Sequence, residues 1–263
     1  MIRTNSGKKK TWQHTDRIKD CLEGGRRLPS LHEGKPALSH MMKEHDHTGC
    51  LRPFARLAAS FSSFQQTYCI EQKEHFRELV QKQRPGAMVL SCCDSRTDPA
   101  LVFACAPGDI FVSRAIAAFV PPYGSSAGAC FRAATAYAVD ALKVQDLIIM
   151  GHTRCGGISG LVAGHGDGPL ADWLEVGRPV LEEARRRKPH ADRAVLQREC
   201  EYLAPVFSVH NLLHYPWVEK ALQEHRLTVH AWLFDLEEGE LHNYNFERHE
   251  YEFLQEMPRD LVP

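Results

Sequence analysis

Two short apolar runs in the sequence each end abruptly in reactive side chains. The runs, residues 87–91 and residues 147–150, lead directly into groups that can bind a metal or hold a proton: Cys92, Asp94, Arg96, His152 and Cys155. Apolar runs of this length, bounded by turn residues, indicate buried strands. In an open parallel sheet, ligands bind beyond the carboxyl ends of the strands. The pattern therefore predicts that these two strand ends meet at one site.

The segments around these strands alternate between strand and helix patterns. The middle of the chain reads β-α-β-α-β, which predicts an α/β fold with a central, mostly parallel β-sheet flanked by helices. Helical spacing of apolar residues over 54–80 adds an N-terminal helical arm of one or two amphipathic helices. The remaining predicted helices cover 99–103 (capped by Asp98), 126–143, 158–162, 172–187, 192–214 and 216–225, and the remaining predicted strands cover 109–113, 227–236 and 241–246.

Length and charge fit one enzyme domain with an added segment. The chain has 263 residues and a formal net charge of -1, so no bulk attraction to nucleic acid or to an anionic membrane is expected. Residues 1–50 are polar and aperiodic, which predicts a flexible extension whose histidines are solvated rather than metal-bound. These histidines are His14, His32, His40, His45 and His47. Residues 51–263 are predicted to form the enzyme domain.

Cysteine usage indicates a reducing compartment. The nine cysteines are an odd number in a long chain, and no apolar segment follows the basic N-terminus, so no secretory signal is expected. We therefore predict a cytoplasmic protein with reduced thiols, a few of which bind metal. A mitochondrial transit peptide is the weaker alternative, because Asp16, Asp20 and Glu23 interrupt its basic face.

The spacing of the reactive groups favours a catalytic zinc site. Alternation along an extended chain places Cys92 and Asp94 on one face and turns Cys93 to the other, where it is expected to pack. Cys92 with His152-x-x-Cys155 gives three strong ligands, and no second Cys-x-x-Cys pair completes a structural site. Arg96 can bind Asp94 bidentately and keep it ionised as a hydrogen-bond acceptor. The alternative for this pair is a structural salt bridge that closes the turn.

Together, the two motifs closely resemble those of the β-class carbonic anhydrases. They read Cys92-x-Asp94-Ser-Arg96 and Gly-His152-x-x-Cys155-Gly-Gly. The resemblance runs from about residue 54 to the C-terminus. It includes the flanking features Pro107-Gly-Asp-Ile-Phe-Val, Arg114 and Asn211-Leu-Leu-x-x-Pro-Trp217.

The resemblance implies a reaction and a set of roles. Zn2+ would be bound by Cys92, His152 and Cys155, and a zinc-bound hydroxide oriented by Asp94 would hydrate carbon dioxide reversibly to bicarbonate and a proton. It also implies an obligate homodimer or a dimer of dimers (a homotetramer), with active sites at the interface. Gln83 lies nine residues before Cys92, the spacing at which plant-like members carry a glutamine that points into the substrate pocket, commonly that of the partner subunit.

Three positions depart from the family pattern. The run Arg114-Ala-Ile-Ala-Ala118 has alanine where many members have asparagine, which puts the local geometry or rate in question. Thr97 occupies a position that is usually apolar. The segment Val89-Leu-Ser-Cys92 lacks the Trp-x-Gly-Cys run of members with a non-catalytic bicarbonate site, so no such inhibitory pocket is expected.

Three alternatives stay open at this point. Carbonyl sulfide or carbon disulfide hydrolysis could use the same site, with the entrance shaped by residues such as Phe119 and Tyr123. A non-catalytic zinc or redox protein would make Asp94–Arg96 purely structural. A Cys–His hydrolase is conceivable, but it explains neither the second cysteine nor the acidic pair. No proton shuttle is assigned among His165, His210 and His214.

Overall fold

The computed structural model describes residues 53–164 and 167–254, in two compact units, Met1–Lys73 and Glu74–Pro263. In the first unit the described part is helical, with α3 (Pro53–Phe64) continuing into the π-helix η1 (Gln65–Glu71). The expected helical pattern over 54–80 is confirmed, since α4 (Lys73–Gln81) follows. The predicted extension at 1–50 and the candidate shuttle His165 lie outside the described residues.

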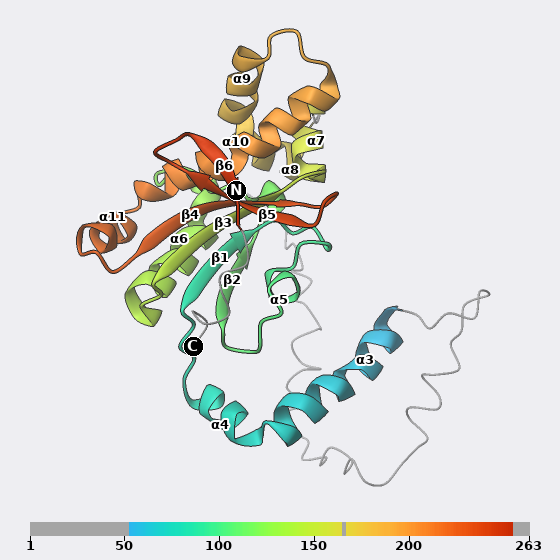
Figure 1. Ribbon diagram of the computed structural model, residues 1–263, viewed down its shortest axis with the longest axis vertical. Coiled ribbons are helices and arrows are strands. Elements are labelled where there is room, and N and C mark those ends of the chain that lie inside the picture. Colours follow the sequence, from blue (N-terminus) through green and yellow to red (C-terminus); the bar gives the residue numbers. More distant parts are fainter. Residues whose placement is uncertain (1–52, 165–166, 255–263) are drawn as a thin grey trace, which may run out of the picture. The chain divides into compact units, whose positions relative to one another are not determined.

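The second unit is built on a six-stranded sheet with the order β2-β1-β3-β4-β5-β6 (Figure 1). The first four strands are parallel, and β5 and β6 add to one edge as antiparallel strands. The predicted α/β fold with a mostly parallel sheet is therefore confirmed, although β6 was not predicted. The strands are β1 (Ala87–Ser91), β2 (Ile110–Arg114), β3 (Asp146–His152), β4 (Thr228–Asp235), β5 (Glu240–Asn245) and β6 (Glu250–Phe253).

Helices connect the parallel strands. They are α5 (Pro99–Val102), η2 (Ile116–Ala118), η3 (Ser126–Gly128), α6 (Ala129–Ala136), η4 (Tyr137–Leu142), α7 (Gly156–Ala163), α8 (Pro169–Leu174), η5 (Glu175–Gly177), α9 (Arg178–Arg187), α10 (Arg193–Leu213) and α11 (Pro216–Gln223). The Asp98 side chain caps α5 as predicted. The helix predicted over 172–187 is broken at Gly177, where a Cβ atom would come within 2.2 Å of the Phe119 ring. Among the described helices, none has the length and apolar character needed to cross a membrane.

Alternating side chains of the central strands are buried on both faces of the sheet. Met88 and Leu90 of β1 join the larger core, which contains residues from η4, α10 and α11. Val89 points to the opposite face and packs with Ile148 and Met150 of β3. Burial on both faces is typical of parallel strands and explains why β1 and β3 read as continuous apolar runs.

The strand order fixes where a ligand can bind. From β1 the chain crosses to β2 on one side, and from β3 it crosses to β4 on the other side. These connections leave the sheet in opposite directions, so the carboxyl ends of β1 and β3 form the topological switch point at which open α/β sheets bind ligands. Cys92 follows β1 directly, and His152 is the last residue of β3.

Candidate metal centre

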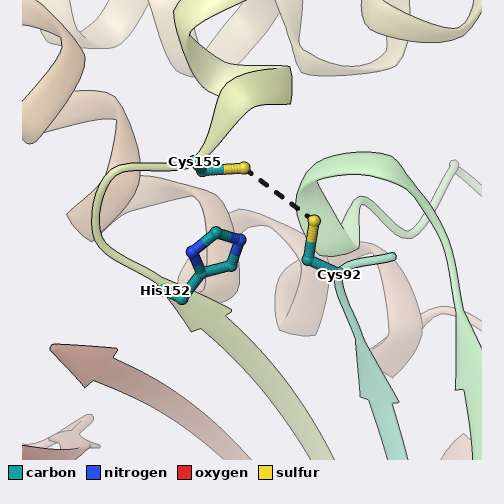
Figure 2. Close-up of side chains that lie close together, drawn as sticks. All are labelled: Cys92, His152 and Cys155. Atoms are coloured by element: carbon teal, nitrogen blue, oxygen red, sulfur yellow. Dashed lines mark hydrogen bonds between the residues drawn. The ribbon is translucent and has the colours of Figure 1, made fainter. Parts of the chain in front are cut away.

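The side chains of Cys92, His152 and Cys155 converge at this switch point (Figure 2). Their ligand atoms all lie within 4.8 Å of one another, and all three residues are buried. The two sulfur atoms are 3.9 Å apart, far beyond a disulfide bond. Two thiolates on a tetrahedral zinc, with zinc–sulfur bonds of about 2.3 Å, would be about 3.8 Å apart. The spacing therefore fits a shared zinc ion.

The His152 ring is oriented for metal binding. Its Nδ1 lies 2.8 Å from the Thr153 carbonyl oxygen, so this nitrogen carries the proton and donates it. Its Nε2 is buried and has no hydrogen-bond partner among the described residues. A buried ring nitrogen without a partner is costly unless a metal takes its lone pair. The donor set thus fits a metal that prefers sulfur and imidazole.

The two cysteine side chains shift each other's pKa in opposite directions. The hydrogen bond from Cys155 lowers the pKa of Cys92, with a further contribution from His152, whereas the neighbouring Cys92 thiolate and burial raise the pKa of Cys155. The ionised form is therefore more favourable at Cys92 than at Cys155. The second thiol requires the positive charge of a metal to lose its proton.

Asp94 lies beside this cluster and is held by Arg96. Its Oδ1 accepts hydrogen bonds from the Arg96 backbone amide at 3.0 Å and from Nε at 2.9 Å, and Oδ2 accepts from the guanidinium at 2.7 Å. The Arg96 hydrogen bonds hold the pKa of this carboxyl well below its usual range. Oδ2 also lies 4.0 Å from His152 Nε2. An ionised acceptor therefore faces the place where the ligand atoms meet.

Arg114, at the end of β2, fixes the turn that carries this acceptor. Its guanidinium donates to the backbone carbonyls of Cys92 at 2.8 Å and of Asp94 at 2.6 Å. It also binds the Asp98 carboxylate at 2.6 Å. Sequence reasoning gave Arg114 no role at the site. The sequence feature that could have indicated this role is the position of Arg114 at the end of β2, the strand that pairs with β1.

Comparison with known proteins agrees with this geometry. The sequence model of the carbonic anhydrase family matches residues 87–241. The chain belongs to the β-carbonic anhydrase family. It is 30% identical to β-carbonic anhydrase 5 (chloroplastic) of Arabidopsis thaliana, over 69% of this chain and 62% of that protein, which is less than two thirds of its length.

Two solved β-carbonic anhydrases share the fold. The structure of CcaA superposes with a TM-score of 0.72 at 28% identity, covering 77% of this chain and 92% of CcaA. A tetrameric β-carbonic anhydrase of Sordaria macrospora gives a TM-score of 0.65 at 26% identity, covering 72% of this chain and 95% of that one.

Gln83 was expected to be a site residue, but the structure does not bring it close to Cys92, His152 and Cys155. It is exposed and precedes β1, whereas Cys92 follows β1. A whole strand therefore separates the Gln83 backbone from the metal ligands of its own chain. The role that the resemblance gives Gln83, in the pocket of a partner subunit, stays a prediction.

The alanines that depart from the family pattern lie in a strained segment. Ala115 and Ala118 are the two alanines that replace asparagine: Ala115 is extended, with φ of -146°, whereas Ala118 is left-handed, with φ of 53°, next to the left-handed Ala117 at 60°. Asparagine adopts the left-handed conformation of Ala118 more readily than alanine does. Side chains from α8 and α10 bind the neighbouring backbone. Trp173 Nε1 donates to the Ile116 carbonyl at 2.9 Å, and Asn211 donates to the Val120 carbonyl at 2.8 Å. These contacts hold the segment without the asparagine amides.

The structure resolves or corrects expectations about four further residues. Thr97 is fully buried, and its hydroxyl donates to the Asp94 carbonyl at 3.2 Å, which accounts for a polar side chain there. The prediction that Cys93 packs inside is wrong: β1 ends at Ser91, and Cys93 is exposed. Phe119 is fully buried and so cannot line an entrance, whereas Tyr123 is 44% exposed.

Proposed function

We propose that this chain is a zinc-dependent carbonic anhydrase that catalyses the reversible hydration of carbon dioxide to bicarbonate and a proton. Cys92, His152 and Cys155 would hold the zinc ion. One observation carries the proposal: three buried ligand atoms converge within 4.8 Å, beside a carboxylate fixed by an arginine. A bound zinc ion lowers the pKa of a water molecule and so supplies a nucleophile near neutral pH.

Asp94 would orient the attacking water. Because Arg96 keeps its pKa low, the carboxylate accepts hydrogen bonds and does not take up the proton. One accepted hydrogen bond fixes the direction of the remaining lone pairs of the water oxygen, which then face the carbon atom of the substrate. Positioning of this kind would raise the rate of hydration by holding the water in a reactive geometry, without any proton transfer to Asp94.

Arg96 has a second role in this scheme. Its guanidinium also donates to the Arg154 carbonyl at 3.2 Å, so the acidic pair is anchored to the loop between His152 and Cys155. The carboxylate and two of the ligands are thereby kept in one arrangement. Arg96 would act on the reaction through Asp94.

Gln83 would complete the site from a second copy of the chain. Its side-chain amide could donate a hydrogen bond to a substrate oxygen, which would stabilise the charge that develops during hydration. This role requires a homodimer or a dimer of dimers with the active sites at the interface. A cytoplasmic location, and the division into an extension at 1–50 and an enzyme domain at 51–263, remain predictions.

The test combines metal analysis with stopped-flow hydration of carbon dioxide. The wild-type chain is expected to contain about one zinc per chain and to hydrate carbon dioxide rapidly. Cys92→Ser should lose zinc and activity, and Asp94→Asn should keep zinc but lose most activity. Stoichiometric zinc without hydration would redirect the proposal to carbonyl sulfide or carbon disulfide, assayed next. A chain without zinc would overturn the ligand assignment.

A further inference from the structure

The loop between the second and third candidate ligands is short and strained. Only Thr153 and Arg154 separate His152 from Cys155, and Arg154 has a left-handed backbone with φ of 59°. A non-glycine residue keeps this conformation only when its surroundings hold it there. The distance between the two ligand atoms therefore depends on whatever fixes this loop.

Glu201 of α10 binds the end of this loop at Cys155. It is only 2% exposed, and its Oε1 accepts a hydrogen bond from the Cys155 backbone amide at 3.0 Å. The same oxygen accepts from Gln197 Nε2 at 2.9 Å. A deeply buried carboxylate is costly unless it is well paired. Here it is paired with the amide of a residue whose side chain is a candidate metal ligand.

A chain of charged contacts links Glu201 to the other half of the loop. Arg198 Nε lies 3.7 Å from Glu201 Oε2, and the Arg198 guanidinium also donates to Glu237. The second oxygen of Glu237 accepts a hydrogen bond from the Arg154 side chain. The loop is thus held at the Cys155 amide and at the Arg154 side chain, by one connected set of residues.

We propose that Glu201 is a positioning residue for the metal centre, anchored by Arg198 and Glu237. The inference rests on the proposed zinc function. By holding the Cys155 amide, Glu201 fixes the loop so that the Cys155 sulfur and the His152 ring already face Cys92 before a metal arrives. Preorganised ligands give up less freedom on binding, so the metal binds more tightly and in one geometry.

Metal affinity and geometry test the proposal directly. Zinc affinity is measured by competition with a chelator, and the cobalt-substituted protein reports thiolate–metal geometry through its charge-transfer and d–d absorption bands. Glu201→Leu is expected to weaken zinc binding by about 10- to 100-fold and to shift the cobalt spectrum. Glu201→Gln keeps an oxygen that can accept from the Cys155 amide, so it should stay within about threefold of the wild-type affinity.

A second pair of variants covers the case in which Glu201→Leu does not fold. The Glu237 side chain is 40% exposed, so Glu237→Gln should be tolerated. It should weaken zinc binding by about three- to tenfold, with a shifted cobalt spectrum. Glu183→Gln is the matched control, because Glu183 also binds two arginines, Arg186 and Arg187 of its own helix, and touches no site residue. It should change neither quantity.

The outcomes separate this inference from the proposed function. If the wild type binds zinc and hydrates carbon dioxide, while Glu201→Leu folds and keeps wild-type affinity and an unchanged cobalt spectrum, the positioning role is overturned and the function stands. If Glu237→Gln and Glu183→Gln changed zinc affinity and the cobalt spectrum equally, the positioning role would also be overturned. If the wild type binds neither zinc nor cobalt at this site, both proposals fail.

Discussion

Arg96 binds both carboxylate oxygens of Asp94 through its guanidinium, with Nε 2.9 Å from Oδ1 and the terminal nitrogen 2.7 Å from Oδ2. Such bidentate pairs fix orientation as well as charge. The Arg96 backbone amide adds a third hydrogen bond to the same carboxylate. All three stabilise the ionised form, so the pKa of Asp94 is well below its usual range. The side chain is a permanent acceptor across the pH range in which the enzyme would work.

Replacing Arg96 with lysine should separate orientation from charge. A lysine ammonium can bind one oxygen at a time and cannot reproduce the planar fork. We expect kcat/KM for carbon dioxide hydration to fall by about 100-fold with unchanged zinc content. The pKa of Asp94 should rise toward its ordinary value, so any acid limb of the pH–rate profile should move to higher pH. Stopped-flow rates and metal analysis measure both effects.

The matched control for this variant is Arg186→Lys. Arg186 forms the same bidentate geometry with Glu183, at 2.8 Å and 2.7 Å, but on the surface of α9. Its loss should leave hydration unchanged. Equal rates for Arg96→Lys and the wild type would contradict the proposed role of the acidic pair.

The wild-type rate should rise from about pH 6 to about pH 9. Two thiolate ligands leave more negative charge at the metal position than two imidazoles would, so the attacking water loses its proton at higher pH. Asp94 does not produce this rise, since its low pKa leaves it ionised throughout the interval. Hydration rates in buffers of constant ionic strength measure the profile. A flat profile would count against this ligand set.

The fold and the candidate metal ligands could be predicted from the sequence for physical reasons. The strands β1 and β3 are buried on both faces, so they appear as uninterrupted apolar runs whose ends mark the topological switch point. Cys92 and His152 lie at those ends, and Cys155 follows within one short loop. Local spacing was therefore enough to bring these residues together.

Other residues at the site depend on contacts between distant segments. Glu201 lies 46 positions after the Cys155 amide that it binds, within a helix whose sequence looks like any amphipathic helix. For Gln83, sequence spacing alone predicted a site residue. The structure places this residue before β1, away from the candidate metal ligands of the same chain. Cys93 was expected to pack inside but is exposed, and nothing in the local sequence indicated that its side chain lies at the surface.

Arg114→Met should damage both stability and metal binding. The arginine donates to two backbone carbonyls of the turn after β1 and to Asp98, and its side chain is only 25% exposed. Removing these charge-assisted bonds should lower the free energy of unfolding by about 2–4 kcal/mol. Zinc affinity should fall as well, because the turn carries Cys92. Denaturant unfolding and chelator competition provide the two measurements.

The control for Arg114 is Arg132→Met. Arg132 also donates to two loop carbonyls, those of Tyr123 and Ser125, but it does not touch the candidate ligands. It should lower stability without weakening zinc binding. If Arg114→Met retained full zinc affinity, the turn would be held by other contacts and the assigned role of Arg114 would be wrong.

Ser208→Ala should show how the left-handed alanine segment is maintained. The Ser208 hydroxyl is fully buried, accepts a hydrogen bond from the Val120 amide at 3.2 Å and donates to the Ala118 carbonyl at 3.2 Å. The alanine variant leaves two buried backbone groups without this partner, so we expect a loss of about 2 kcal/mol in the free energy of unfolding. Ser62→Ala removes a hydroxyl on exposed helix α3 and should change stability by less than about 0.5 kcal/mol. Denaturant unfolding at one protein concentration compares the two variants, and equal small effects would mean that Trp173 and Asn211 hold the segment without Ser208.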